Sequence, residues 1–167
     1  HLYIGFPARY VDRGWTDAAK RLPEQKLRRE RGAVNERYGT AVTDSLLMSS
    51  RDGETFQRWQ EALVRPGPQP DRWVCRNNLV AWGLVETESH FEGAPDELSL
   101  YVVEGYYQGE SCRVRRHTMR VDGFVSVSAP LGGGELLTKP LRFEGDRLSI
   151  NFSTSAAGSI RVELQDA

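Results

Sequence analysis

Residues 97–127, ELSLYVVEGYYQGESCRVRRHTMRVDGFVSV, constrain the fold more strongly than any other stretch of the chain. Apolar side chains occupy every second position from Leu98 to Val102, which is the period of a strand with two distinct faces. A turn cluster at 108–111 precedes a second alternating run at 113–121. Asp122-Gly123 is a strong hairpin signal before another extended run at 124–127. The stretch predicts an antiparallel meander of three strands.

Similar short extended segments recur along the rest of the chain. We expect strands at residues 2–6, 38–48, 77–87, 135–138, 141–143, 148–152 and 159–165. They are joined by Gly, Pro and Asp turns and show almost no helical periodicity, which predicts an all-β protein of propeller, barrel or sandwich type. Gly83, inside the 77–87 segment, predicts a bulge or a close backbone approach.

Three connecting segments have a distinct character. Residues 12–37 form a polar excursion, in which Thr16 is expected to cap a helical turn; an excursion of that length is usually functional or interfacial. The string from Ser50 to Gly53 contains Asp52 in a turn, and a structural hairpin clasp is favoured over a catalytic role. The glycines at 132–134 predict a flexible connector, which divides the chain into domains at 1–128 and 129–167.

Composition excludes some partners and leaves others open. The 22 basic and 23 acidic side chains nearly balance, so nothing suggests a nucleic acid or an anionic membrane as partner. No apolar run reaches the roughly 18 residues of a membrane span. Cys75 and Cys112 lack the spacing of a zinc site, and buried free thiols are favoured over a disulfide. The chain begins at His1, which suggests a processed or partial product.

Several strings together are similar to a known group of proteins. They are LYIGFPARY, TDSLLMSSRDGETFQRW, NLVAWGLVETES, ELSLYVVEGY, RRHTMRVDGFVSVSAP, GGELLTKPLRFEG and LSINFSTSAAGSIRVELQDA. The combination resembles the C-terminal half of bacterial proteins related to the five-bladed β-propeller glycoside hydrolases, the clan of invertases, levanases and arabinanases. The resemblance implies propeller blades followed by part of a β-sandwich, a carbohydrate partner and an exported protein.

The resemblance also implies that part of the catalytic machinery lies elsewhere. In that clan three acidic residues on successive blades act in hydrolysis, and at least the first two belong to N-terminal blades. This chain is expected to begin after them and to stop before the sandwich is complete. An incomplete propeller exposes unpaired strand edges, so the rest of the parent chain or a second copy is an expected partner.

Glycoside hydrolysis requires two carboxyl groups roughly 5 to 10 Å apart. Glu86, Glu88 and Glu104 are candidates because they stand at strand ends near aromatic residues, although solvent-facing glutamates at strand ends are the more common case. Asp44 is a further candidate, because an acid inside a strand is costly unless it is paired or faces a funnel. No metal ligands are predicted, and the sequence is silent on Ca²⁺.

Candidate sugar-binding residues accompany these acids. Aromatic rings stack on the apolar face of a pyranose, and the candidates are Trp82, Tyr106 and Tyr107, with Arg9 and Tyr10 as a possible pair at a propeller centre. His117, a lone histidine in a strand, is more often structural than catalytic.

Three functions stay open at this level. The first is a glycoside hydrolase, or a C-terminal fragment of one, that acts on a polysaccharide or oligosaccharide. The second is a non-catalytic carbohydrate-binding β-module, and the third is a surface domain that docks a protein through the Arg-rich excursion. Carboxylates that converge across one pocket favour hydrolysis, whereas dispersed carboxylates favour binding.

Overall fold

A computed structural model describes residues 2–74, 76–106 and 112–166. The chain divides into two compact units, His1–Phe124 and Val125–Ala167. Every helix and strand of the described residues lies in the first unit. The division falls between residues 124 and 125, close to the boundary at 128/129 that the glycine-rich connector predicts.

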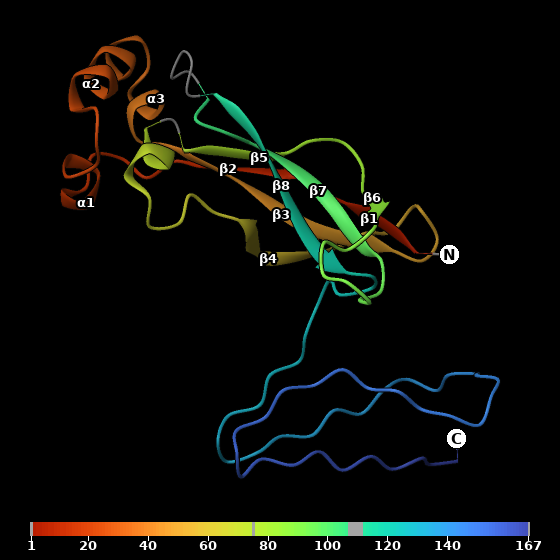
Figure 1. The fold of residues 1–167 in the computed structure, drawn as a ribbon. Coiled ribbons are helices and arrows are strands. Elements are labelled where there is room, and N and C mark those ends of the chain that lie inside the picture. Colours follow the sequence, from red (N-terminus) through yellow and green to blue (C-terminus); the bar gives the residue numbers. More distant parts are fainter. Residues whose placement is uncertain (1, 75, 107–111, 167) are drawn as a thin grey trace. The chain divides into compact units, whose positions relative to one another are not determined.

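Strands dominate the first unit, and the helical part is small (Figure 1). The strands are β1 (Tyr3–Gly5), β2 (Ala8–Val11), β3 (Val42–Ser50), β4 (Gln57–Val64), β5 (Asn77–Val80), β6 (Val85–Thr87), β7 (Glu97–Glu104) and β8 (Arg113–Arg120). The helices are α1 (Asp17–Lys20), α2 (Gln25–Val34), α3 (Glu36–Thr40) and the 3-10 helix η1 (Pro70–Trp73).

The strands form one open, mixed sheet in the order β1-β3-β5-β7-β6, with β2 and β4 paired to β3 and β8 paired to β7. The β3–β5 pair is parallel, and the other pairs are antiparallel. The structure thus shows a strand-rich fold. Blades arranged around a propeller axis remain a prediction that follows from the resemblance.

The long strand β3 is the centre of one half of the sheet. It pairs with β1, β2, β4 and β5, and most of its side chains are buried. Leu46 and Leu47 are adjacent in sequence and point to opposite faces, yet both are buried. Such burial on both faces is what a central strand requires.

A serine side chain joins the two halves of the sheet. Ser45 on β3 is 1% exposed. Its hydroxyl donates to the carbonyl of Asn78 (3.1 Å) and accepts from the amide of Val80 (2.9 Å), both on β5. Because the backbone register between β3 and β5 covers only two residue pairs, this hydroxyl extends the connection beyond the ladder.

The second half of the sheet consists of β5, β6, β7 and β8, and the apolar core packs against its central strand β7. Val64 from the end of β4 packs with Leu100 and Val102 of β7. Partly buried side chains complete this cluster: Leu63, Val80, Leu84 and Met119. The alternation predicted for 98–102 is confirmed here, because Leu100 and Val102 are buried while Tyr101 between them is exposed.

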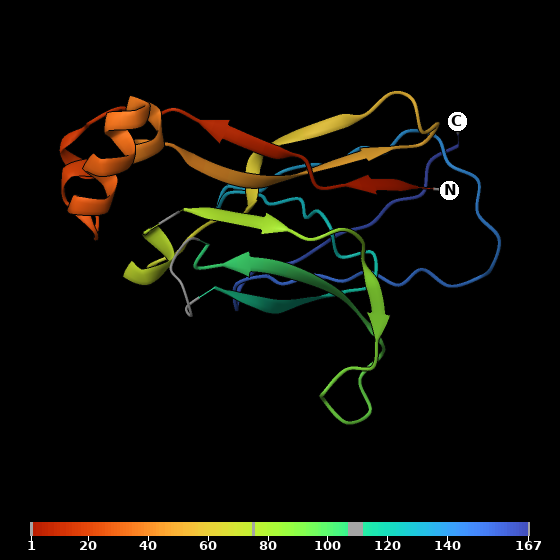
Figure 2. The same cartoon turned by 90° about the horizontal axis from the view of Figure 1, so that it is seen from above.

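The polar excursion folds into helices that gather at one end of the first unit (Figures 1 and 2). Thr16 caps α1 as predicted, its hydroxyl accepting from the amide of Ala19 at 3.2 Å. The helices extend further than the predicted turn or two. Asn35 caps α3 through the amide of Arg37, so residues 38–40 are helical and the strand predicted at 38–48 begins only at Val42.

The connection between β3 and β4 is the hairpin clasp that the sequence predicts. One oxygen of Asp52 accepts from the amides of Glu54 (2.9 Å) and Thr55 (2.8 Å) and from the hydroxyl of Ser50 (2.7 Å). Gly53 takes the left-handed backbone at a φ of 80°. These hydrogen bonds lower the pKa of Asp52, with the one from Ser50 contributing most.

Other predicted strands are shorter than expected or not formed. The 77–87 segment splits into β5 and β6, because Gly83 with a φ of 91° interrupts it. Asp122, at a φ of 60°, makes the predicted turn, but residues 124–127 do not continue as a strand. The predicted turn at 108–111 lies outside the described residues.

The second unit differs most from the sequence prediction. Residues 125–166 contain neither helix nor strand, and their side chains are exposed. The alternating side chains Leu148, Ile150 and Phe152 are about half exposed or more. No second sheet within these residues covers their apolar face, and an apolar face stabilises a strand only when it is covered.

We expect Ser45→Ala to destabilise the first unit by about 1–3 kcal/mol, because a buried amide and a buried carbonyl lose a partner. Urea-induced unfolding followed by tryptophan fluorescence would measure this change. Ser49→Ala, on the same strand, is the control and should change the free energy of unfolding by less than about 0.5 kcal/mol. Equal effects of the two substitutions would contradict the bridging role of Ser45.

Candidate functional site

The apolar face of β7 ends in a buried carboxylate. The period of two that buries Leu100 and Val102 also places Glu104 on the same face, and Glu104 is 0% exposed. A buried carboxylate is costly unless charged partners compensate the lost hydration. Glu104 therefore requires charged partners close to its carboxylate.

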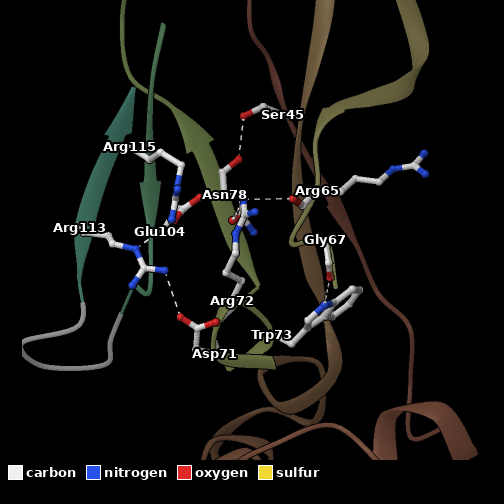
Figure 3. A network of polar contacts seen from close by, with 10 residues as sticks. All are labelled: Ser45, Arg65, Gly67, Asp71, Arg72, Trp73, Asn78, Glu104, Arg113 and Arg115. Atoms are coloured by element: carbon white, nitrogen blue, oxygen red, sulfur yellow. Dashed lines mark hydrogen bonds and ion pairs between the residues drawn. The ribbon is translucent and has the colours of Figure 1, made fainter. Parts of the chain in front are cut away.

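Three arginines from two elements surround this carboxylate (Figure 3). Arg113 and Arg115 lie on β8, and their Nε atoms donate to Glu104 Oε2 at 3.1 and 2.9 Å. Arg72 comes from η1, and its Nη2 lies 2.8 Å from Glu104 Oε1 as an ion pair, although the angle falls outside hydrogen-bond geometry. We call Glu104 and these three arginines the arginine cluster.

Strand register explains why two of the arginines meet Glu104. In the antiparallel β7–β8 pair, Arg113 is directly opposite Glu104 and Arg115 is opposite Val102. Residues directly opposite share a face, and the period of two places Arg115 on that face as well. His117, opposite Leu100, follows in the same row.

Helix η1 supplies the remaining members of the surroundings (Figure 3). Arg72 Nη2 also donates to the Arg65 carbonyl (3.3 Å) and to Asn78 Oδ1 (3.4 Å). Asp71 accepts from Arg113 Nη2 at 3.1 Å, so Arg113 bridges two carboxylates. Trp73 Nε1 donates to the Gly67 carbonyl at 2.5 Å, which attaches η1 to the preceding loop.

The arginines keep Glu104 ionised. Burial by itself raises the pKa of the Glu104 carboxyl, but the hydrogen bonds from Arg115 and Arg113 and the charge of Arg72 outweigh burial, so the net pKa is lowered. The hydrogen bond from Arg113 likewise lowers the pKa of Asp71. Burial is the main reason that the pKa of His117 is lowered, which favours its neutral form.

Two other predicted residues form a separate pair. Arg9 on β2 is opposite Asp44 on β3, and Arg9 Nη2 donates to Asp44 Oδ2 at 2.7 Å. The Asp44 side chain is 5% exposed, so the acid inside this strand is paired, as the sequence argument requires. Arg9 Nη1 also donates to the Gln60 carbonyl at 2.7 Å.

The other predicted residues do not gather around these pairs. Glu86 on β6 is exposed, and so is Glu88 just beyond that strand. Trp82 is fully exposed in the segment between β5 and β6. Tyr10 is half exposed and has the Arg37 guanidinium 5.5 Å from its ring centroid.

Tyr106, two residues after β7, is 40% exposed. Tyr107 lies outside the described residues, as does Cys75. Cys112 is an exposed free thiol, so the buried position expected for it is wrong. It precedes β8, which pairs with β7 alone among the described strands.

Sequence reasoning selected Glu104 but missed the arginines and Asp71. A signal was present in the strand at 113–121, where Arg113, Arg115 and His117 alternate with other side chains. A basic row opposite a strand that ends in a glutamate favours an ion pair across the two strands. The contribution of Arg72 has no comparable signal, because only the folded chain brings η1 to β7.

A surface pocket of about 600 Å³ is lined by other residues than the described members of the arginine cluster and the Arg9–Asp44 pair. It is lined by the loop after β2 and the start of α3, through Asp12, Arg13, Gly14, Asn35, Glu36 and Arg37. None of the predicted catalytic or sugar-binding residues lines it. Its residues belong to the polar excursion.

Comparison with protein-family models, curated proteins and solved structures finds no match to this chain. In the described residues no helix is long and apolar enough to cross a membrane. The same residues contain no cluster of three or more His, Cys, Asp or Glu side chains that could hold a metal ion. The arginine cluster, the Arg9–Asp44 pair and the exposed aromatic side chains are therefore the features of the chain that bear on its function.

We expect Glu104→Gln to destabilise the protein by about 3–5 kcal/mol at pH 7, because three arginines lose their buried counter-charge. Urea unfolding would measure the loss. Glu86→Gln, an exposed glutamate on a neighbouring strand, is the matched control and should change stability by less than about 0.5 kcal/mol. If Glu104→Gln were as stable as Glu86→Gln, the carboxylate would not hold the cluster together.

The same carboxylate predicts a pH dependence. The pKa of Glu104 in the folded protein lies below its ordinary value of 4.5. The unfolded chain therefore takes up this proton first as the pH falls. The contribution of Glu104 to stability should be complete above pH 4.5 and should disappear as the pH falls through the folded-state pKa. The midpoint of thermal unfolding, measured across this range in wild type and Glu104→Gln, should show a smaller acid-dependent decrease in the variant.

Proposed function

We propose that this chain binds carbohydrate, as a non-catalytic portion of a protein related to the propeller glycoside hydrolases. The observation that carries the proposal is the state of the candidate acids. Glu104 is enclosed by arginines, Asp44 is paired with Arg9, and Glu86 is exposed on the surface. Acids that are dispersed in this way suit carbohydrate binding better than hydrolysis, which needs two carboxyl groups across one site.

The chemistry of hydrolysis explains this preference. A glycosidase needs one carboxyl group that is protonated near neutral pH, which requires a raised pKa. The pKa values of Glu104 and Asp71 are both lowered, and arginine hydrogen bonds contribute to each shift. Neither group can serve as the proton donor while these bonds persist. The arginine cluster thus supports a role in binding charge.

Trp82 provides a surface on which a sugar ring could stack. Its side chain is fully exposed, and the left-handed backbone of Gly83 follows it directly. The preceding residue is fixed, because the Ala81 amide donates to the Tyr101 carbonyl at 2.7 Å. A large exposed ring on an anchored backbone loses little conformational freedom on binding, which favours affinity.

We expect Trp82→Ala to weaken binding to oligosaccharides by about tenfold or more, as loss of a central aromatic contact does. Affinity electrophoresis on plant and bacterial polysaccharides would identify a ligand, and calorimetry would then give its affinity. Phe91→Ala removes another exposed aromatic side chain and is the control, expected to bind as wild type does. Equal binding by Trp82→Ala and wild type would remove Trp82 from the binding surface.

We also expect the 167-residue chain to release no reducing sugar from any polysaccharide that it retains. Incubation of the chain with the retained polysaccharide, followed by a reducing-end assay, would test this. Release of reducing sugar by the wild-type chain would contradict the non-catalytic role.

A further inference from the structure

We propose that Arg115 and Arg113 bind the negatively charged group of an acidic glycan, either the carboxylate of a uronic acid or a sulfate ester. This inference rests on the carbohydrate binding proposed above and names the class of sugar. It concerns the outward part of the arginine cluster, where both side chains are partly exposed, 45% for Arg115 and 41% for Arg113.

Among the described residues, the arginine cluster and Asp71 together hold more positive than negative charge. Arg72, Arg113 and Arg115 contribute three positive charges, and Glu104 and Asp71 contribute two negative ones. The lowered pKa values of both acids keep them ionised near neutral pH, so one positive charge remains. The chain as a whole has a formal charge of -1, so this excess is local.

The geometry of Arg115 leaves its two terminal guanidinium nitrogens, Nη1 and Nη2, available to a ligand. Its Nε donates to Glu104 Oε2 at 2.9 Å, which fixes the base of the guanidinium. Neither Nη1 nor Nη2 donates to any other residue that the structure describes. A planar guanidinium held at one nitrogen can offer the other two to a carboxylate or sulfate as a bidentate pair.

Arg113 has a similar but more occupied guanidinium. Its Nε donates to Glu104 and its Nη2 to Asp71. Because it stands two residues from Arg115 on the same face of β8, its charge adds to the field at Nη1 and Nη2 of Arg115. Glu104 thus positions both arginines without meeting the ligand itself.

The cluster also has spare donors behind these two arginines. Arg72 Nε and Asn78 Nδ2 are buried and have no hydrogen-bond partner within the described part of the chain. Asn78 is 1% exposed, so water reaches it poorly. These two nitrogens add partial positive charge close to Glu104, whose buried Oε1 likewise has no hydrogen-bond partner in the described residues.

A nucleic acid is a less suitable polyanion for this surface. Nucleic-acid-binding proteins neutralise several phosphates with an extended basic stripe. Here the positive excess is confined to one cluster, and the next basic side chain of β8, Arg116, is paired with Glu97 at 2.9 Å. One or a few charged sugars fit this local excess better than a long phosphate backbone does.

The test compares a charged glycan with a neutral counterpart of the same length. Calorimetry would measure binding of oligogalacturonate, of its methyl ester and of a sulfated oligosaccharide to the 167-residue chain. Double-stranded DNA serves as a polyanion without sugar acids. We expect at least about tenfold tighter binding of an acidic glycan than of the ester, since charge-assisted hydrogen bonds are the strong ones. Whichever acidic ligand binds more tightly identifies the anion as carboxylate or sulfate.

Variants locate the effect on one face of β8. Arg115→Gln should abolish the preference for the acidic ligand while retaining affinity for the ester. Arg115→Lys keeps the positive charge beside Glu104 but lacks the two Nη donors, so the preference for the acidic ligand should fall severalfold. This variant tests the proposal in the case that Arg115→Gln does not fold. Arg116→Gln removes a neighbouring arginine on the opposite face and should keep the preference intact.

The outcomes separate this inference from the proposed function. Equal binding of acid and ester overturns the anion site but leaves carbohydrate binding in place. An unchanged preference in both Arg115 variants, or an equal loss in Arg116→Gln, also overturns it. Binding to DNA as tight as to the acidic glycan would mean non-specific charge attraction. Binding to no glycan at all overturns the proposed function, and the acidic-glycan assignment with it.

Discussion

The buried carboxylate of Glu104 is the interaction on which the second half of the sheet depends. Removing a carboxylate from water costs several kcal/mol, and here two arginines of β8 and one of η1 offset that cost. The contact ties together elements that are distant in sequence. Strand β7, strand β8 and the short helix η1 must therefore be placed together for Glu104 to remain charged and buried.

The first half of the sheet depends on a different connection. Strand β3 reaches β5 through a short parallel register, and the Ser45 hydroxyl extends that contact to Asn78 and Val80. Asn78 also accepts from Arg72 through its side chain, which brings the serine bridge and the arginine cluster together on β5. The two halves of the sheet are thus joined by polar side chains as well as by the backbone ladder.

This arrangement changes the chemical meaning of the acidic residues. A glutamate at a strand end beside aromatic residues satisfies the sequence criteria for a glycosidase acid. Once three guanidinium groups surround it, the carboxyl has a lowered pKa and holds the arginines in place. The charge that can meet a ligand then belongs to Arg115 and Arg113, and their exposed parts define the surface that we propose for the anionic group of an acidic sugar.

The sequence by itself determined the features that depend on neighbouring residues. The alternation at 98–102, the clasp around Asp52, the Thr16 cap and the turn at Asp122 follow from local periodicity and local hydrogen bonds. Only the tertiary structure decided which side chains are covered. It brought Arg72 to Glu104 and left the alternating residues near 148–152 exposed. It also made residues 38–40 part of a capped helix, so that β3 begins at Val42. The physical reason is that burial and charge pairing depend on partners far along the chain, which local periodicity does not identify.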